Sequence, residues 1–181
     1  MKTTKIKWIN PIGGTLIVLP QTKAILWGGI EDNNGKDYNF ACSFSDYTSV
    51  TKYKETAMIV LGDEPLMTGI IQKDKHLVLI VRWYYAERES DVIHLIEQTD
   101  FNHLHNRLTH KQIFLESANY VLFESVERFE NVSEYLTFTI ESGEYSIDTY
   151  EIKNETTAVL VDRVMITTHP LSVVSSSPHR N

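Results

Sequence analysis

The chain has 181 residues and a formal net charge of −7, with 24 Asp and Glu residues against 17 Lys and Arg residues. This acidic balance disfavours a nucleic-acid-binding protein, because such proteins usually carry a basic surface. Cys42 is the single cysteine, which excludes an intramolecular disulfide and a multi-cysteine metal site.

The first residues do not resemble a secretion signal. Lys2, Lys5 and Lys7 are followed by Trp8-Ile9-Asn10-Pro11, which is not the apolar core of a signal peptide. No apolar run approaches the length of about 18 residues that a membrane-spanning helix needs. We therefore expect a cytoplasmic protein with no membrane partner.

Strand patterns dominate the first half of the chain. Residues 15–19 and 56–61 are short apolar runs with Gly or Pro close by, as in buried strands. Residues 76–85 form the longest such run, rich in β-branched and aromatic side chains, and predict a central strand. Residues 37–42 carry a weaker helical pattern, from which we expect at most a short helical turn.

One clear helix is predicted near residues 90–99. Ser90 suits the N-cap position and Asp91 the first turn. Residues 100–111 are mostly polar and predict a loop. Apolar side chains recur at helical spacing along one side of the predicted helix, at Val92, Ile93, Leu95 and Ile96.

The C-terminal half alternates apolar and polar residues. Residues 135–141 predict a strand, Ser142 and Gly143 a tight turn, and residues 144–152 the returning strand of a hairpin. Residues 157–166 would close a three-stranded antiparallel meander. Residues 113–123 would add one or two strands to the same sheet.

These elements predict a β-rich α+β fold with antiparallel sheets in a sandwich-like arrangement. No Pro-, Gly- or Ser-rich linker divides the chain. We therefore expect one domain over residues 1–166. Residues 167–181, which contain three consecutive serines and two prolines, are expected to be a C-terminal tail.

Histidines offer one candidate metal site. His103 and His105 form an H-x-H pair, and His110 follows five residues later. Three histidines could bind zinc, and Asp100 is the closest carboxylate. Nothing in the spacing fixes a fourth ligand, so we interpret the segment as a solvated polar loop and expect no metal or cofactor.

The glycine pairs and the cysteine do not form a recognisable catalytic site. Gly13 and Gly14 precede a strand, and Gly28 and Gly29 open a polar loop, so both pairs are interpreted as turns. Cys42 has no histidine beside it in the sequence and is predicted to be a buried structural thiol. The sequence also lacks a G-x-S-x-G nucleophile motif. We therefore expect a protein that is not an enzyme.

The acidic pair Asp63 and Glu64 follows a predicted strand directly and lies between Gly62 and Pro65. The flanking residues favour a turn. Two adjacent carboxylates after a strand could also bind a metal or contact a protein partner. The turn is the preferred interpretation, with a protein contact as the alternative.

Aromatic side chains gather at predicted strand ends. Packing in a core is the first explanation, because aromatic residues dominate cores. The alternative is a binding hot spot, where Trp, Tyr and Arg are enriched, and Arg82 directly precedes three of these aromatic residues. They are Trp8, Trp27, Trp83, Tyr84 and Tyr85.

Five motifs occur in a recognisable order. They are residues 8–20, residues 26–29, residues 37–42, residues 60–65 with Thr68, and residues 81–83. The series resembles the bacterial immunity protein 21 family over roughly residues 8–166. That resemblance implies a protein that neutralises a cognate toxin of a polymorphic toxin system. Residues 37–61 and 136–150 also resemble, more faintly, the inhibitor of a competence DNA-entry nuclease.

The leading hypothesis is an immunity protein that binds a toxin and blocks its active surface. A nuclease must hold a polyanion, so its cleft is commonly basic, and an acidic protein can occupy such a cleft. Residues 111–163, with eleven acids against four bases, supply most of this acidity. The predicted partner-binding residues are Trp27, Asp37, Tyr38, Asp63, Glu64, Arg82, Trp83 and Tyr84.

Two other functions stay open. A small-molecule-binding β domain would use Trp8, Trp27 and Trp83 to line a pocket. A hydrolase would use Asp63, Glu64 and the loop histidines as a metal centre. The sequence does not predict an oligomeric state.

Overall fold

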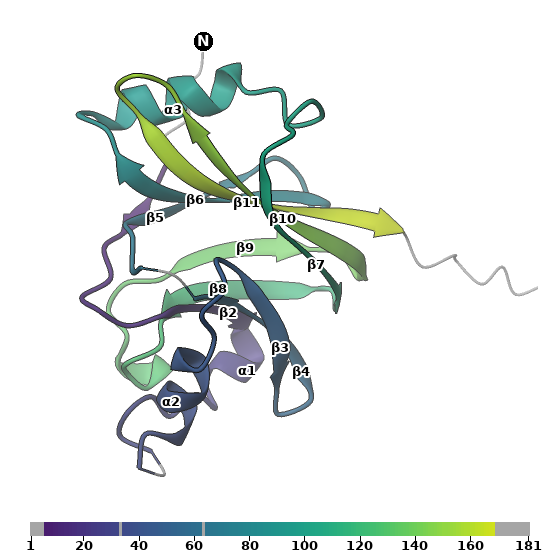
Figure 1. Ribbon diagram of the computed structural model, residues 1–181. Helices are drawn as coiled ribbons and strands as arrows, with labels where there is room; N and C mark the ends of the chain where they lie inside the picture. The colour runs from purple at the N-terminus through teal and green to yellow at the C-terminus, as the bar shows by residue number, and fades with distance from the viewer. Residues whose placement is uncertain (1–5, 33, 63, 169–181) are drawn as a thin grey trace, which may run out of the picture.

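In a computed structural model, which describes residues 6–32, 34–62 and 64–168, eleven strands form two antiparallel sheets (Figure 1). The first sheet consists, in spatial order, of β1 (Trp8–Ile9), β5 (Thr68–Gln72), β6 (Leu77–Tyr85), β11 (Ala158–Thr168), β10 (Gly143–Lys153) and β7 (Arg107–Leu115). The second consists of β3 (Ser49–Tyr53), β4 (Thr56–Leu61), β2 (Leu16–Pro20), β8 (Ala118–Glu124) and β9 (Leu136–Ile140).

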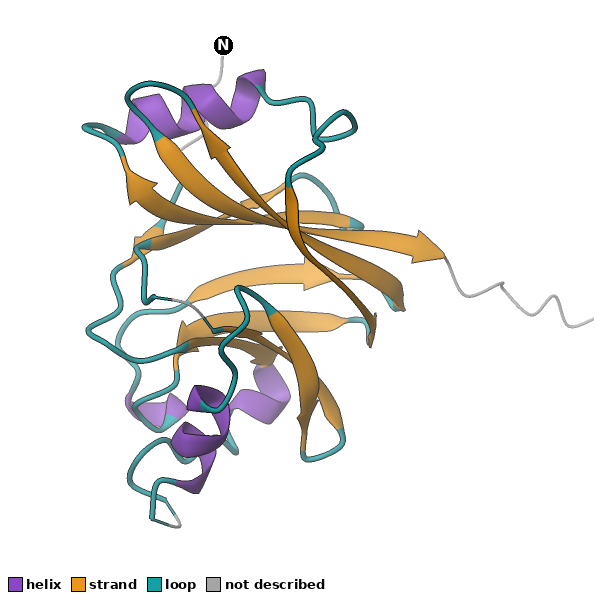
Figure 2. Cartoon of the chain, viewed as in Figure 1, coloured by secondary structure: helices purple, strands orange, loops and turns teal. Residues whose placement is uncertain are grey.

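Helices cover the outer faces of both sheets, so the fold has four layers (Figure 2). Helix α3 (Glu89–Gln98) packs on the first sheet. On the second sheet lie α1 (Gln21–Ala24), α2 (Lys36–Cys42) and the 3₁₀ turn η1 (Phe129–Asn131). The predicted β-rich, sandwich-like α+β fold is confirmed. Within the part of the chain that the structure describes, no helix is long and apolar enough to cross a membrane.

Because each sheet is covered on both faces, its central strands are apolar on both sides. In β6, Val78 and Ile80 face the second sheet, whereas Leu79 and Val81 face α3. All four side chains are at most 1% exposed. Side chains alternate between the two faces of a strand, so a strand that is covered on both faces has a continuous apolar run in its sequence. This arrangement explains why the longest apolar run of the sequence became a central strand.

Several predicted elements are confirmed with small shifts of their ends. The apolar runs at residues 15–19, 56–61 and 76–85 correspond to β2, β4 and β6. The weak helical pattern at residues 37–42 corresponds to α2. The clear helix corresponds to α3, which begins one residue before Ser90. Ser90 is therefore inside the helix, and the predicted N-cap was wrong. The N-cap residue is Arg88, whose side chain bonds to Asp91 at 3.1 Å.

The predicted three-stranded meander was wrong. β9 pairs with β8 in the second sheet, whereas β10 pairs with β7 and β11 in the first. Ser142 and Gly143 therefore carry the chain from one sheet to the other. Phe138 of β9 and Tyr145 of β10 both belong to the core between the sheets. Alternation along each strand is the same for strands that lie side by side and for strands that lie face to face, so the pattern could not separate the two arrangements.

Residues 107–111 were predicted to be a loop, but they form the first half of β7. β7 is an edge strand, and its outward side chains can be polar without a cost of burial. Arg107 and His110 both contact Asp148 on the neighbouring β10, at 3.0 and 2.7 Å. β7 and β8 also lie in different sheets, which corrects the prediction that residues 113–123 belong to a single sheet.

Two tyrosines in the core between the sheets are expected to make the fold sensitive to alkaline pH. Burial raises the pKa of Tyr145 from 10.0 to about 12, and burial also raises the pKa of Tyr120. The unfolded chain releases these phenolic protons at a lower pH than the folded protein does. The free energy of unfolding should therefore fall as the pH rises from about 10 to about 12.

Urea unfolding at a series of pH values across that range, with phenolate absorbance as a second readout, measures this effect. Tyr145→Phe removes one of the titrating groups and should flatten the dependence. The hydroxyl of Tyr145 also donates to the carbonyl oxygen of Glu141 at 2.8 Å, so the variant is compared with the wild type by slope rather than by absolute stability. A slope identical in both proteins would contradict the assignment.

Candidate functional site

The predicted partner-binding residues fall into two separate places. Trp27, Asp37 and Tyr38 lie on the outer side of the second sheet, around α1 and α2. Arg82, Trp83 and Tyr84 lie at the end of β6 in the first sheet. Glu64 is exposed in the loop between β4 and β5. Asp63, its neighbour, lies outside the described residues.

Arg82 is buried, with 1% of its side chain exposed. Its Nη2 atom lies 3.1 Å from Oδ2 of Asp162, a fully buried carboxylate. The guanidinium also donates to the carbonyl oxygen of Tyr47 at 3.0 Å and to the hydroxyl of Thr48 at 3.1 Å. Thr149 donates to the same carboxylate at 2.7 Å. Arg82 thus joins strands of the first sheet to the loop before β3, and we revise its predicted role from partner binding to structure.

Trp27 and Asp37 also have structural roles. Trp27 is 2% exposed, and its Nε1–H donates to the carbonyl oxygen of Ser125 at 2.9 Å. Asp37 Oδ2 accepts a hydrogen bond from the backbone N–H of Gly28 at 2.9 Å and another from the hydroxyl of Tyr53 at 2.7 Å. Burial, followed by the bond to Asp37, raises the pKa of Tyr53. These bonds tie the segment at residues 26–29 to α2.

The three tryptophans do not share a cavity. Trp8 and Trp83 pack edge to face, with ring centroids 5.4 Å apart, in the cluster under α3. Trp27 belongs to the cluster on the far side of the second sheet. The prediction that these three residues line one small-molecule pocket was therefore wrong.

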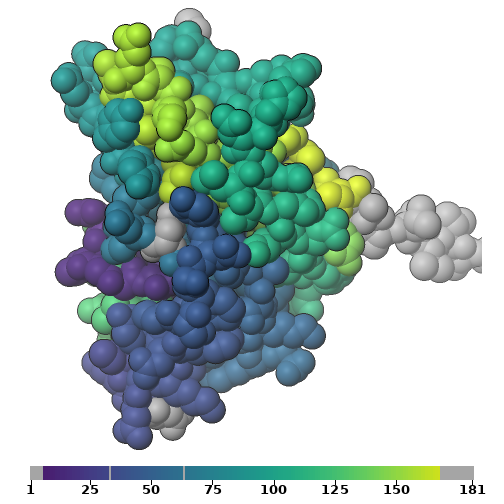
Figure 3. Space-filling model, viewed as in Figure 1, coloured from purple at the N-terminus to yellow at the C-terminus, as the bar shows by residue number. Residues whose placement is uncertain are grey.

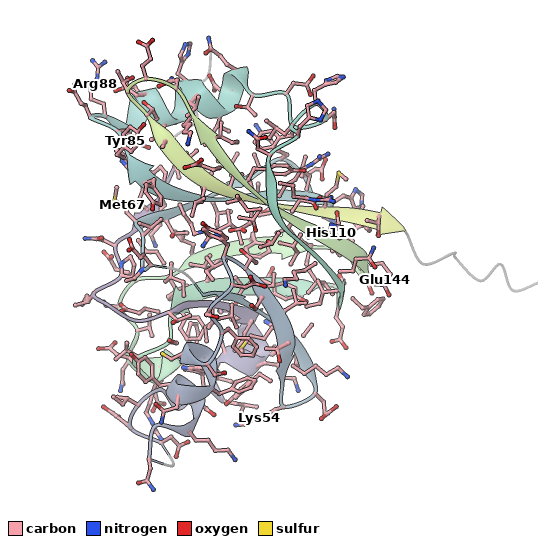
Figure 4. The ribbon with its side chains drawn as sticks, viewed as in Figure 1. Lys54, Met67, Tyr85, Arg88, His110 and Glu144 are labelled. Atoms are coloured by element: carbon pink, nitrogen blue, oxygen red, sulfur yellow. The ribbon has the colours of Figure 1, made fainter. Side chains whose placement is uncertain are left out.

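A first exposed surface lies where β6 ends, and we call it the aromatic rim. Tyr84 is 52% exposed and Tyr85 47% exposed. Tyr47 is 41% exposed, and its carbonyl oxygen accepts a hydrogen bond from Arg82. The backbone N–H of Trp83 donates to the carbonyl oxygen of Met67. Figure 4 shows Met67 and Tyr85 on the same side of the molecule. Of the predicted contact residues, Tyr84 is exposed on this surface, and Glu64 is exposed in the loop three residues before Met67.

A second surface is a cavity of about 360 Å³ beside the loop that leads from β1 to β2. We call it the glycine-pair groove, after Gly13 and Gly14. Figure 3 shows that this loop (purple) projects at one side of the molecule. The groove is lined by Ile9, Asn10, Pro11, Ile12, Gly13, Gly14, Leu16, Tyr38, Glu124, Val126, Glu127, Val132, Ser133 and Glu134.

Glu124, the last residue of β8, holds the glycine-pair loop in place. Its carboxylate accepts hydrogen bonds from the backbone N–H groups of Ile12, Gly13 and Gly14. The bonds to Ile12 and Gly13 are 3.0 and 2.9 Å long. A Cβ atom on Gly14 would lie 2.3 Å from Cγ2 of Val126, so any larger residue would force the side chain of Val126 to move. The loop forms an ordered bend, and the three N–H groups of Ile12 and the glycine pair already hold a carboxylate of the same chain.

Tyr38 forms one wall of the groove from helix α2. Its hydrogen bond with Cys42, one turn further along α2, is the largest cause that raises the pKa of the phenol, and the negative charge of Glu124 adds to it. The predicted burial of Cys42 was wrong, because the thiol is exposed. Ala41 is the residue of this turn that points into the core, and a pattern of seven residues gave too little periodicity to decide which of the two neighbours is buried.

The opposite wall, residues 126–134, is anchored to the core by η1. Phe129 packs against Phe123 and Tyr135, with ring centroids 4.8 and 5.3 Å apart. The carbonyl oxygen of Val126 accepts the N–H of Ile30 at 2.8 Å. The wall is therefore fixed both to the second sheet and to the loop that follows Trp27.

Most residues of the groove could not be predicted from the sequence. Its lining includes three glutamates, at positions 124, 127 and 134, and no Lys, Arg or His. The excess of acids in residues 111–163 was the available signal, but it did not single out these three. The glycine pair and Tyr38 were recognised separately, and only the tertiary structure brings them together.

The loop histidines do not gather into a metal site. His103 Nδ1 pairs with Asp100 at 2.7 Å, and His110 lies on β7 beside Asp148. Across residues 6–32, 34–62 and 64–168, no group of three His, Cys, Asp or Glu side chains is placed to hold a metal ion.

Removing the Glu124 carboxylate is expected to loosen the glycine-pair loop. Glu124→Ala should lower the free energy of unfolding by about 1–2 kcal/mol, because hydrogen bonds to a charged group contribute more than neutral ones but this site is partly exposed. Hydrogen exchange at the amides of Ile12, Gly13 and Gly14 reports the loss locally. Glu124→Gln keeps one acceptor oxygen, so its free energy of unfolding should lie between those of the wild type and of Glu124→Ala. Unchanged protection of these three amides in Glu124→Ala would contradict the anchoring role.

Comparison with known protein families gives a match over most of the chain. The model of a protein family described as Immunity protein 21 matches residues 7–158. This range contains every residue that lines the groove and every strand up to the first residue of β11. No curated protein and no solved structure matches the chain.

Proposed function

This chain belongs to the immunity protein 21 family, and from that membership we propose that it binds a cognate bacterial toxin and neutralises it by blocking the toxin's active surface. The observation that carries the proposal is the family match from residue 7 to residue 158, which spans both sheets. An immunity protein acts through a protein partner, so the relevant sites are surfaces rather than catalytic residues.

The acidic character of the chain supports a nuclease as the target. The net charge is −7. A nuclease holds a polyanion and needs a basic cleft to do so. An acidic surface placed over that cleft occupies the positions that phosphates would take, and charge complementarity speeds the encounter of the two proteins.

Exposure decides which predicted residues can take part in this contact. Tyr84 and Glu64 are exposed and stay in the proposed contact set. Tyr38 is half-buried and reaches the surface within the groove. Trp83 is half-buried against Trp8 and contributes mainly by positioning its neighbour Tyr84.

The proposed place of action is the cytoplasm. Cys42 is an exposed thiol, and an unpaired exposed cysteine suits a reducing compartment. The partner is a toxin domain that reaches the same compartment or is made there.

Reconstitution with the adjoining toxin tests the proposal. The probe is the C-terminal domain of the reading frame next to this gene, produced alone and together with the chain. We expect growth arrest by that domain alone, survival when the chain is co-produced, and a stoichiometric complex in size-exclusion chromatography. Absence of both protection and complex would remove the proposal.

The nature of the target is tested separately. Incubation of the purified toxin domain with DNA and with RNA shows whether it cleaves nucleic acid, and addition of the chain should stop the cleavage. A toxin that leaves both substrates intact would remove the nuclease assignment while the immunity function stands.

A further inference from the structure

Hydrogen bonds within the chain order two sides of the glycine-pair groove. Glu124 holds the N–H groups of the loop, and the wall after β8 is bonded through Ser125 to Trp27 and through Val126 to Ile30. A surface that is already ordered loses little conformational entropy on binding, so more of its contact energy appears as affinity.

An exposed apolar side chain stands at the mouth of this groove. Ile12 is 97% exposed although the N–H of the same residue is held by Glu124. Ile30, in the loop bonded to Val126, is 54% exposed. Single exposed apolar residues are ordinary on protein surfaces. Here they accompany a cavity whose lining is itself partly apolar, through Leu16 and Val126.

The charge in the groove is negative and largely uncompensated. Glu124 receives only backbone N–H groups. Glu127 and Glu134 are exposed and make no ion pair with another described residue. Arg128, the closest cation along the chain, is paired with Glu130 at 3.1 Å. Lys7 donates to the carbonyl oxygen of Tyr135, next to Glu134, at 3.0 Å and forms no ion pair with that glutamate. A partner that brings a cation therefore meets carboxylates that are not engaged in ion pairs with described residues.

From these observations we infer that the glycine-pair groove is where the toxin docks, and that it receives a Lys or Arg side chain next to an aliphatic residue on a projecting toxin segment. The inference rests on the proposed function and names the surface and the chemistry of its partner. The cation lies against Glu127 and Glu134, and the aliphatic residue packs against Ile12.

A matched pair of charge reversals tests this inference. Glu127→Lys/Glu134→Lys changes the groove. Glu97→Lys/Glu144→Lys makes the same change of net charge at exposed positions on α3 and at the start of β10 (Figures 1 and 4). Both proteins have equal net charge, so long-range attraction for a basic partner falls equally in both.

The adjoining toxin domain, in a catalytically inactive form, is titrated with each protein by calorimetry. We expect binding about 100-fold weaker for the groove variant and within about threefold of wild type for the control, since like charges at the contact cost far more than remote ones. Ile12→Ala should weaken binding about tenfold, and Ile25→Ala, at another exposed isoleucine, should leave it unchanged. Thermal unfolding of all four variants shows that they remain folded.

The outcomes separate the inference from the function. Wild-type affinity in both Glu127→Lys/Glu134→Lys and Ile12→Ala would overturn the inference and leave the immunity function intact. A toxin domain that does not bind the wild-type chain would remove the function and the inference together. Saturable spermidine binding that the groove variant loses, combined with unchanged toxin affinity, would assign the groove to a small cation and overturn the docking role.

The chemistry of the docked segment has its own readout. A photoreactive benzoylphenylalanine in place of Ile12 is expected to cross-link to a toxin segment that contains Lys or Arg. Replacement of that basic residue by Glu should weaken wild-type binding and restore binding to Glu127→Lys/Glu134→Lys. Cross-linking to a segment without a basic residue would overturn the assigned chemistry.

Discussion

Replacing Arg82 by methionine is expected to lower the free energy of unfolding by about 3–5 kcal/mol, because it leaves a buried carboxylate without its cation. The side chains of Arg82 and Asp162 are 1% and 0% exposed, so water cannot take over the lost contact. Thr48 and Thr149 would still donate to Asp162, but two hydroxyl groups do not balance a charge. Because small domains are stable by about 5–15 kcal/mol in total, this loss is a large share of the stability.

Urea unfolding followed by tryptophan fluorescence measures the effect. A second variant, Arg82→Met/Asp162→Asn, removes both charges and keeps an acceptor oxygen for the threonines. It should recover at least part of the loss, since a buried ion pair costs much of its attraction in desolvation. If Arg82→Met alone stayed within about 1 kcal/mol of the wild type, the pair would not be desolvated in the way that its burial indicates.

Replacing Trp27 by alanine is expected to cost a similar amount, about 3–5 kcal/mol, through the cavity that a deleted aromatic ring leaves in a packed core. The indole is 2% exposed and lies between Tyr53 and Phe123, with ring centroids 4.9 and 6.4 Å away. The variant also leaves the carbonyl oxygen of Ser125 without its donor. The damage should therefore extend to the wall of the groove that follows Ser125.

Two further substitutions separate packing from hydrogen bonding at this position. Trp27→Phe keeps most of the ring contact and removes the donor, and we expect a loss of about 1–2 kcal/mol. Trp83→Ala removes a half-buried tryptophan from the cluster under α3 and should cost less than Trp27→Ala. Equal losses for Trp27→Ala and Trp83→Ala, measured in the same urea series, would argue against the core role of Trp27.

These stability variants also guide the interpretation of binding experiments. Arg82 and Trp27 lie within family motifs of the sequence, and both are buried in the structure. Loss of toxin protection on their replacement would report unfolding rather than a lost contact. Variants at Ile12, Glu127 and Glu134 change exposed side chains, so their effects on binding can be separated from stability.

Local patterns in the sequence determined most of the elements. The apolar runs of β2, β4 and β6 could be predicted because a buried strand needs little beyond its own residues to be recognised. The apolar spacing of α3 was equally clear, although its start was misplaced by the assumption that Ser90 would cap it. The family resemblance came from the same local motifs, and the match over residues 7–158 confirms it.

The pairing of strands depended on contacts that no local pattern records. β9 and β10 follow each other in the chain and show the same alternation, yet they lie in different sheets, and Phe138 and Tyr145 enter the core between the sheets from opposite sides. The groove was decided in the same way. It joins the glycine-pair loop, α2 and the wall after β8, whose lining residues are up to 125 positions apart in the sequence, from Ile9 to Glu134. Composition determined that the chain is acidic. Only the packing of the two sheets and of the loops that they hold decided which carboxylates lie on the ordered surface of the groove.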